Sequence, residues 1–339
     1  MSRSYYRPLV RFDAPEPEGH SLPVAGGPGW FDQAVKYDRG QAPRTVPLEA
    51  VPQEWRDRIS APRAPVAGVA MDRCRVMGIL NVTPDSFSDG GQYQSSAAAL
   101  NHARALVKEG ADILDVGGES TRPGARTVPR EAEIARVEPV IRAIASEIAA
   151  PVSIDTRKSV VAEAAVDAGA RLVNDISGFV YDPMLARFCT ERNLPVCVMH
   201  MMGEPETMQD DPKFEDVLLD VYDFLERQIL KLEDLGMPRS NIVVDPGIGF
   251  GKLMHHNLAL LANVSLYHGL GCPILVGASR KGFVGKLTGV EKAAERMPGS
   301  VACALAVAAQ GVQIVRVHDV AETAQALTML RAIQGRGKT

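Results

Sequence analysis

The sequence predicts a (β/α)₈ TIM barrel preceded by an irregular N-terminal extension. Three observations indicate this architecture: short β-rich runs alternate with amphipathic segments from residue 75 onward, there are eight such runs, and the first 70 residues differ in composition. Strands that alternate with helices are typical of a parallel sheet whose crossovers are helical. Eight units within about 260 residues match a closed barrel.

The eight predicted strands are short, and their apolar runs are typical of strands buried on both faces. An open, doubly wound sheet is the structural alternative, but it seldom has so many evenly spaced units. The predicted strands are residues 76–81, 113–118, 152–155, 171–175, 195–200, 241–245, 273–279 and 313–318.

Between these runs, apolar residues recur at helical spacing. The segment S-R-K-G, which ends at Gly282, could open an additional short helix. The other predicted helices are residues 95–109, 131–149, 157–168, 183–192, 214–235, 256–266, 297–310 and 320–334.

Residues 1–70 form the predicted extension, and residues 71–339 form the barrel. The extension holds 10 of the 23 prolines and both tryptophans, Trp30 and Trp55. Proline removes backbone donors and interrupts regular elements, whereas disordered segments contain few aromatic residues. We therefore expect an irregular arm that is anchored on the barrel by its aromatic side chains. It could cover the bottom of the barrel or join a dimer interface.

The composition excludes several classes of protein. A net charge of −4 provides no general basic field for nucleic acid. No apolar run reaches the roughly 20 residues that span a bilayer, and the first residues lack the apolar core of a signal peptide. The five cysteines are scattered, without a CxxC pair, which is typical of reduced thiols. We expect a cytoplasmic protein that binds neither nucleic acid nor a membrane.

Polar side chains stand at or just after the end of every predicted strand. Because all strands of a (β/α)₈ barrel end at one mouth, where active sites lie, these side chains predict a site there. One polar strand end is usually only a cap or a turn former, but eight in register are hard to explain in that way. They are Asn81, Glu119, Asp155, Asn174 with Asp175, His200, Asp245, the segment 279–281, and Arg316 with His318.

The first group of these residues suits a flat heterocycle. Asp155, Asn174 and Asp245 offer carboxylate and amide groups, which pair with the donor-rich edge of a pterin or a purine. The plain alternative is a set of solvated acids at strand ends, and burial beneath a ring would distinguish the two interpretations.

The second group suits a phosphate. Lys281, Arg316 and His318 follow the seventh and eighth strands, the usual place for phosphate recognition in such barrels. Arginine binds phosphate through a planar fork, and lysine acts as a point charge. Surface charge is the plain alternative for the two cations, and a structural histidine is the alternative for His318.

Three loops complete the predicted mouth. The polar loop NVTPDSFSDGG (81–91) and the loop GGESTRPGA (117–125) could close over the mouth and exclude water. The segment DPGIGFGK (245–252) is not a P-loop, because the GK[ST] ending is missing. Its glycines would let the backbone and Phe250 approach a flat ligand closely.

These segments together resemble the dihydropteroate synthase family. The resemblance covers residues 75 to about 335 and leaves out the extension. It rests on MGILNVTPDSFSDGG (77–91), DVGGESTRPGA (115–125), SIDTRK (153–158), NDISG (174–178), VMHM (198–201), DPGIGFGK (245–252), GASRKGF (277–283) and RVHDV (316–320).

The resemblance implies an enzyme of folate biosynthesis, which condenses 6-hydroxymethyl-7,8-dihydropterin pyrophosphate with 4-aminobenzoate to give 7,8-dihydropteroate and pyrophosphate. It also implies Mg²⁺ as cofactor, a homodimer, and a target for sulfonamides. The pterin pyrophosphate would be bound by Thr121, Asp155, Asn174, Met199, Asp245, Phe250, Lys281, Arg316 and His318.

The resemblance implies three further roles. Asn81 would hold the Mg²⁺ that accompanies the pyrophosphate. The residues taken as catalytic are Asp89, Lys281, Arg316 and His318. The aminobenzoate side would be formed by Phe87, Thr121, Arg122, Pro123 and Gly282.

The chain departs from the family pattern in two places. Many members carry serine after the lysine of S-R-K, whereas this chain has Gly282, which could offer only its backbone N–H to the aminobenzoate carboxylate. Typical members also lack an N-terminal arm of this length.

Two other functions fit the same barrel. A methyltetrahydrofolate-type methyltransferase would leave Lys281 and the TPDSFSDGG loop without a role. A non-catalytic pterin-binding paralogue would be expected to lose loop residues such as Asn81, Phe87 and Asp89, all of which are present.

Overall fold

The computed structural model describes residues 3–13, 19–82, 92–120, 127–203, 208 and 211–335. Its centre is a parallel eight-stranded sheet in the order β11-β10-β9-β8-β7-β6-β13-β12. The sheet closes into a barrel, because Val244 bridges to Ile274 and the amide of Val244 donates to the carbonyl of Pro273 at 2.9 Å. The strands are β6 (Arg75–Asn81), β7 (Ile113–Gly117), β8 (Val152–Asp155), β9 (Leu172–Asp175), β10 (Val196–Met199), β11 (Ile242–Asp245), β12 (Leu275–Val276) and β13 (Ile314–Val317). The predicted barrel and its eight strands are confirmed.

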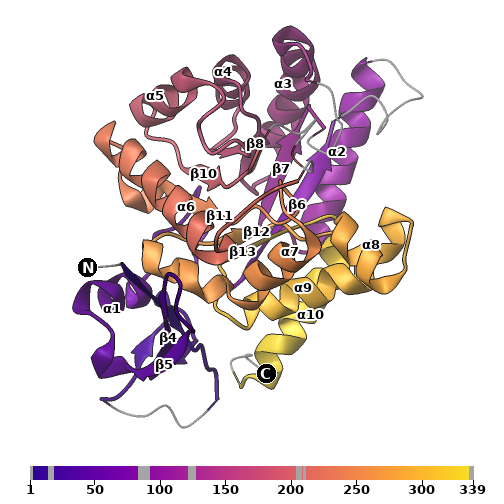
Figure 1. The fold of residues 1–339 in the computed structure, drawn as a ribbon. Helices are drawn as coiled ribbons and strands as arrows, with labels where there is room; N and C mark the ends of the chain where they lie inside the picture. The colour runs from indigo at the N-terminus through magenta and orange to yellow at the C-terminus, as the bar shows by residue number, and fades with distance from the viewer. Residues whose placement is uncertain are drawn as a thin grey trace.

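Helices surround the strands, as Figure 1 shows. They are α2 (Gln92–Glu109), α3 (Arg130–Glu147), α4 (Ser159–Asp167), α5 (Pro183–Glu191), α6 (Val217–Asp234), α7 (Met254–Ala262), α8 (Gly282–Thr288), α9 (Met297–Ala308) and α10 (Val320–Ile333). Short 3₁₀ helices also occur at η1 (Leu48–Ala50), η3 (Arg239–Asn241), η4 (Val264–Leu270) and η5 (Ala293–Arg296).

Two helices, α5 and α6, begin directly after an aspartate whose side chain caps the helix. Pro183 opens α5 immediately after Asp182, whose side chain accepts from the amide of Met184. Asp216 caps α6 in the same way, and α6 therefore begins at Val217, three residues after the predicted start at 214. None of the helices in the described ranges is both long enough and apolar enough to cross a bilayer.

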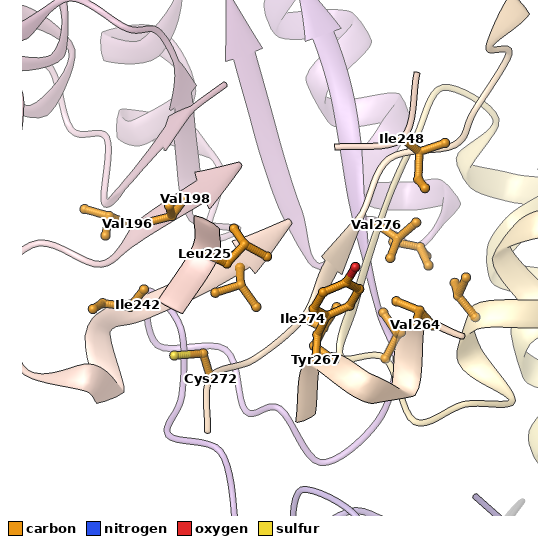
Figure 2. Close-up of a cluster of buried hydrophobic side chains, with 14 of the residues drawn as sticks. Val196, Val198, Leu225, Ile242, Ile248, Val264, Tyr267, Cys272, Ile274 and Val276 are labelled. Atoms are coloured by element: carbon orange, nitrogen blue, oxygen red, sulfur yellow. The ribbon is translucent and has the colours of Figure 1, made fainter. Parts of the chain in front are cut away.

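Alternate residues of each strand face two separate apolar layers. Cys197 of β10 and Val243 of β11 point into the barrel, together with one residue from each of five other strands. Their neighbours Val196, Val198 and Ile242 point outward and pack with the residues of α6 and η4 (Figure 2). This alternation fixes which strand residues can reach the mouth.

The segment just before β6 closes the bottom of the barrel. Val66 pairs with Val69 in an isolated antiparallel bridge, and Val66 and Met71 are buried against the interior layer of the barrel. The expectation that the N-terminal arm could cover the barrel bottom is met by these last residues of the arm.

The prediction that residues 1–70 are irregular is wrong. They contain a three-stranded antiparallel sheet, a second short strand pair and one helix. Regular structure forms here because the prolines lie mostly at strand ends and turns, where the missing backbone N–H of proline costs little. The elements are β1 (Ser4–Pro8), β2 (Leu22–Pro23), β3 (Trp30–Phe31), β4 (Gln33–Asp38), β5 (Arg44–Pro47) and α1 (Gln53–Ser60).

The extension lies beside the barrel (Figure 1), where β1 and α1 contact η4. Aromatic and charged side chains also attach it to α6. Trp55 stacks on Tyr222 of α6, with ring centroids 5.5 Å apart and 22° between the planes. The Tyr5 hydroxyl donates to Asp223 at 2.8 Å, and Arg39 binds Asp220 at 2.6 Å. The expected aromatic anchoring is therefore confirmed, and acidic residues of α6 add to it.

Candidate functional site

Arg316 is the centre of the polar cluster at the barrel mouth. It is the third residue of β13, flanked by the buried residues Val315 and Val317, and its side chain turns inward. Nε donates to Oδ2 of Asp115 at 2.5 Å, and Nη2 donates to Oδ2 of Asp155 at 2.7 Å. The cation therefore joins carboxylates from two other strands.

Asp115 is a site residue that the sequence reasoning missed. It lies in the middle of β7, is fully buried, and also accepts a hydrogen bond from Nδ2 of Asn174 at 3.2 Å. The available signal was an acidic residue inside the otherwise apolar run ILDVG, since a buried charge needs a partner. Its partner Arg316 lies 201 positions later in the chain.

Two carboxylate oxygens in this cluster have no partner within the described part of the chain. They are Oδ1 of Asp115 and Oδ1 of Asp155, both buried. A buried acceptor without a donor is costly, and in native sites such atoms commonly await a ligand or water. The cluster can accept hydrogen bonds from a ligand with N–H donors.

The charges of this cluster are strongly perturbed. The pKa of Asp155 is raised to about 7. Burial is the main cause, Arg316 acts in the opposite direction, and the Asp115 carboxylate adds to the increase. Burial likewise raises the pKa of Asp245 to about 6. For Arg316, burial acts to lower the pKa, but the two carboxylates prevail and hold it above the usual value. Perturbed acids gathered in one place are typical of functional sites.

An apolar wall stands beside the polar cluster. Met199 at the end of β10 and Phe250 in the loop after β11 are buried together with Ile176 and Met208. Nζ of Lys281 lies 3.9 Å from the centre of the Phe250 ring, a cation–π contact. The arrangement offers a flat apolar surface bordered by acids and cations, as a planar heterocycle requires.

Glycines allow the loop after β11 to pack this closely. Gly247 has φ +69°, and a Cβ on it would lie only 1.9 Å from the carbonyl oxygen of His200. The amide of Gly247 donates to Oδ1 of Asp245 at 2.7 Å, which orients that carboxylate. Only glycine fits this position, as the predicted close backbone approach requires.

His318 and the S-R-K segment follow β13 and β12, and Lys281 of that segment reaches the Phe250 ring. Nδ1 of His318 lies 3.1 Å from Oγ of Ser279, and burial, assisted by Arg316, lowers the pKa of His318 to about 3. The imidazole is therefore neutral at physiological pH. Arg280 has φ +57° and pairs with Asp319, so its role is to fold the turn that presents Lys281.

Asn81 stands at the end of β6 and is half-buried. A Cβ built on Gly117 of the neighbouring strand would lie 3.8 Å from Oδ1 of Asn81 and 3.7 Å from Oδ2 of Asp155, so both oxygens lie near Gly117. The described residues contain no cluster of three or more His, Cys, Asp or Glu side chains arranged to hold a metal. Mg²⁺ usually takes one or two protein oxygens plus water and substrate phosphates, and this sparse oxygen set suits it.

Three polar strand-end residues have structural partners rather than positions in the cluster. Glu119 binds Lys158 at 2.7 Å and the amide of Val128 at 2.6 Å. Asp175 accepts from Ser177 and Phe179, and His200 contacts Lys252. For these residues the capping and core explanations prevail.

The remaining predicted residues divide into two sets. Gly282 is the first residue of α8 and is exposed, and a Cβ there would meet no atom within 4 Å. The others lie outside the described residues, so their positions stay predictions: Phe87, Asp89, Thr121, Arg122 and Pro123.

The comparisons with known proteins agree on one family. The model of the family described as pterin binding enzyme matches residues 77–318. A dihydropteroate synthase of Escherichia coli K12 is 47% identical over 257 residues, which is 76% of this chain and 90% of that protein.

Solved structures give the same result. The dihydropteroate synthase of Xanthomonas albilineans with 4-aminobenzoic acid has a TM-score of 0.75 and 46% identity, covering 80% of this chain and 98% of that one. The same enzyme in complex with 7,8-dihydropteroate has a TM-score of 0.72 and 42% identity, covering 80% and 99%.

Proposed function

We propose that this chain, which belongs to the family of pterin-binding enzymes, is a dihydropteroate synthase. It joins 6-hydroxymethyl-7,8-dihydropterin pyrophosphate to 4-aminobenzoate and releases 7,8-dihydropteroate and pyrophosphate. The carrying observation is a pair of buried oxygens, Oδ1 of Asp115 and Oδ1 of Asp155, that have no hydrogen-bond partner among the described residues and that accompany the apolar wall of Met199 and Phe250. A pterin presents amino and ring N–H donors at its edge and two apolar faces, which this pair of features can receive together.

The pterin side of the reaction follows from these contacts. Asp155, Asn174 and Asp245 accept from and donate to the polar edge of the ring, while Phe250 and Met199 line its face. Lys281, held over the Phe250 ring, points a cation toward the same slot. These groups fix the position of the reacting methylene and provide much of the rate enhancement through orientation.

We propose that the bond to the leaving pyrophosphate breaks first, a step that needs no enzyme nucleophile, and none stands among the described site residues. The carbon–oxygen bond electrons leave with pyrophosphate, the pterin ring stabilises the resulting cation, and the arylamine nitrogen then bonds to the methylene carbon and loses a proton. Arg316 and the neutral His318 stabilise the leaving charge by charge–charge attraction and hydrogen bonding. Asp89, in the first loop, is proposed to lie near the reacting methylene.

We propose Mg²⁺ as the cofactor, held at Asn81 and by the pyrophosphate oxygens. When bound, Mg²⁺ supplies Lewis-acid stabilisation of the leaving group. The position of Asn81 at the end of β6, on the side of the mouth, supports this assignment, because Mg²⁺ accepts an amide oxygen among its ligands.

The second substrate is assigned to the loop side of the mouth. Phe87, Thr121, Arg122 and Pro123 are proposed to form the aminobenzoate site, with the N–H of Gly282 toward its carboxylate. The same site would bind sulfonamides. A dihydropteroate synthase of Yersinia pestis, 43% identical over 79% of this chain, was solved with a sulfonamide drug complex, which supports the proposal.

We also propose a cytoplasmic homodimer. The five free cysteines agree with a reducing compartment. Helices α7 and α10 carry exposed apolar residues, among them Met254, Met329 and Ile333, which would be covered in a dimer. Light scattering of the purified protein at several concentrations tests the assembly, and a mass of one chain throughout would contradict it.

The activity is tested with purified protein, Mg²⁺ and both substrates, with dihydropteroate detected chromatographically. The proposal is supported if dihydropteroate forms only when all components are present. EDTA should abolish its formation. Pterin binding by calorimetry without any product would show that the chain only binds the ligand, while methyl transfer to a corrinoid protein would place it with the methyltransferases.

A further inference from the structure

Lys252 is a buried lysine whose described polar partners are all neutral. It ends the loop DPGIGFGK, and only 3% of the residue is exposed. Its Nζ lies 3.0 Å from the carbonyl oxygen of Phe250, 3.2 Å from the carbonyl oxygen of His200 and 2.9 Å from Nδ1 of His200. The ring of His200 is neutral, because burial lowers its pKa well below the usual value.

A buried ammonium group surrounded by neutral partners is costly to keep. Burial lowers the pKa of Lys252 to about 7, an effect that the nearby Asp245 opposes and Lys281 reinforces. An apolar residue of the same length would avoid this cost if the position only needed to be filled. The three hydrogen bonds therefore indicate that this position requires the N–H donors of the lysine side chain.

These bonds connect two parts of the pterin slot. His200 directly follows Met199 at the end of β10, and Phe250 stands in the loop after β11. By bonding both carbonyls, Lys252 fixes the loop against the strand end. Gly251 shows how close this approach is, since a Cβ there would lie 2.4 Å from the carbonyl oxygen of Met202.

The fixed loop in turn sets the position of a cation. The Phe250 ring lies under Nζ of Lys281 at 3.9 Å, and a Cβ on Gly249 would lie 3.1 Å from Cδ of the same lysine. A shift of the loop would therefore move both the apolar face of the slot and Lys281.

We propose that Lys252 is a positioning residue for the pterin substrate, which it serves by holding Phe250, and through it Lys281, in the geometry that receives the ring. This inference rests on the proposed function and assigns Lys252 a role without contact to either substrate.

The test is Lys252→Met, which keeps the length of the side chain and removes its donors. We expect the KM for the pterin pyrophosphate to rise about tenfold, as the loss of a buried charged hydrogen-bond donor would give. The KM for 4-aminobenzoate should not change. The variant His200→Leu removes one of the three acceptors and leaves both carbonyls, so it should raise the same KM by a smaller factor.

Arg63→Met is the matched control. Arg63 is also a buried cation that donates to backbone carbonyls, those of Ala61 at 2.9 Å and His268 at 3.1 Å, but it belongs to the extension. Its loss should lower the melting temperature and leave both KM values unchanged.

The outcomes separate the two proposals. If Lys252→Met folds and its KM for the pterin pyrophosphate equals that of the wild type, the positioning role is wrong. If it does not fold, an unchanged KM in His200→Leu has the same meaning. If the wild type itself makes no dihydropteroate, the proposed function fails, and calorimetric titration of the same variants with the pterin pyrophosphate alone still decides the role of Lys252.

Discussion

The guanidinium of Arg316 lies 2.7 Å from Oδ2 of Asp155, although β13 and β8 are separated by β6 and β7 in the sheet. The contact therefore crosses the barrel rather than following its wall. It joins Arg316, which we propose to bind the pyrophosphate, to Asp155, which we propose to bind the pterin ring. The two halves of the proposed substrate site therefore share one charge cluster.

Asp115 should matter for turnover as much as the residues predicted from the sequence. Asp115→Asn removes the charge that fixes Nε of Arg316, and we expect kcat to fall about 10- to 100-fold, the effect of losing a charged hydrogen bond in a buried site. Asp112→Asn is the control, since Asp112 stands at the other end of the barrel and pairs with Arg73 and Arg75. Equal effects of both variants in steady-state kinetics would remove Asp115 from the site.

Asp245 should make stability depend on pH. Burial raises its pKa from 3.8 to about 6, so between these values the folded protein keeps a proton that the unfolded chain has released. The free energy of unfolding therefore falls as pH rises through this window, and the full penalty remains above it. Asp245→Asn should be more stable than the wild type above pH 6, by about 3 kcal/mol, and similar to it near pH 4. Urea unfolding at both pH values measures this, and two parallel pH profiles would contradict the assignment.

Lys281 should be needed for catalysis, whereas another lysine of the same helix region should not. Lys281→Ala removes the cation over Phe250, and we expect turnover to fall by orders of magnitude. Lys286→Ala removes an exposed lysine of α8 and should leave kcat within about twofold, as for most surface substitutions. Single-turnover rates of the two variants provide the comparison.

Gly282 leaves room for a better aminobenzoate site. A Cβ at this position would meet no atom within 4 Å, and its backbone is already helical, so serine fits without strain. Gly282→Ser should lower the KM for 4-aminobenzoate about three- to tenfold by adding a hydroxyl donor. Gly282→Ala is the control, because it adds a side chain without the hydroxyl. A serine variant that behaves like the alanine variant would show that the carboxylate lies elsewhere.

Trp55 should stabilise the protein without affecting catalysis. Its ring is buried against Tyr222 and lies against Gly269, and Trp55→Ala should lower the free energy of unfolding by about 3 kcal/mol. Leu287→Ala, at an exposed site, should have little effect. Denaturant titration measures both, and unchanged stability of Trp55→Ala would mean that its packing on Tyr222 does not stabilise the protein.

Most of the barrel could be predicted from the sequence, because its strands and helices are indicated by patterns within short segments of the chain. Apolar runs and apolar residues at helical spacing reflect contacts between residues that lie a few positions apart. The exceptions are also local: Asn263 ends α7 inside the predicted helix 256–266. The strand predicted at 273–279 shrinks to Leu275–Val276, because the chain turns at Gly277 toward the left-handed Arg280.

Long-range pairings could not be predicted in this way. The role of Asp115 depends on Arg316, and the order of the extension depends on pairings such as Tyr5 with Tyr37 in a proline-rich region. Amino-acid composition indicates neither the partner of Asp115 nor the strand pairing in the extension. The resemblance to a known family supplied most of the site, and burial and hydrogen bonding supplied Asp115 and Lys252.

The attachment of the extension also constrains how the chain can fold. Tyr5 and Asp223 are 218 positions apart, so the first strand leaves the ribosome long before its docking surface on α6 has been made. Until then, Tyr5 and Trp55 lack their aromatic partner Tyr222, and apolar surface that is exposed in this way favours aggregation. Docking of the earliest segment therefore waits until α6 and η4 have been synthesised, and a nascent chain that stops before α6 exposes an aromatic surface.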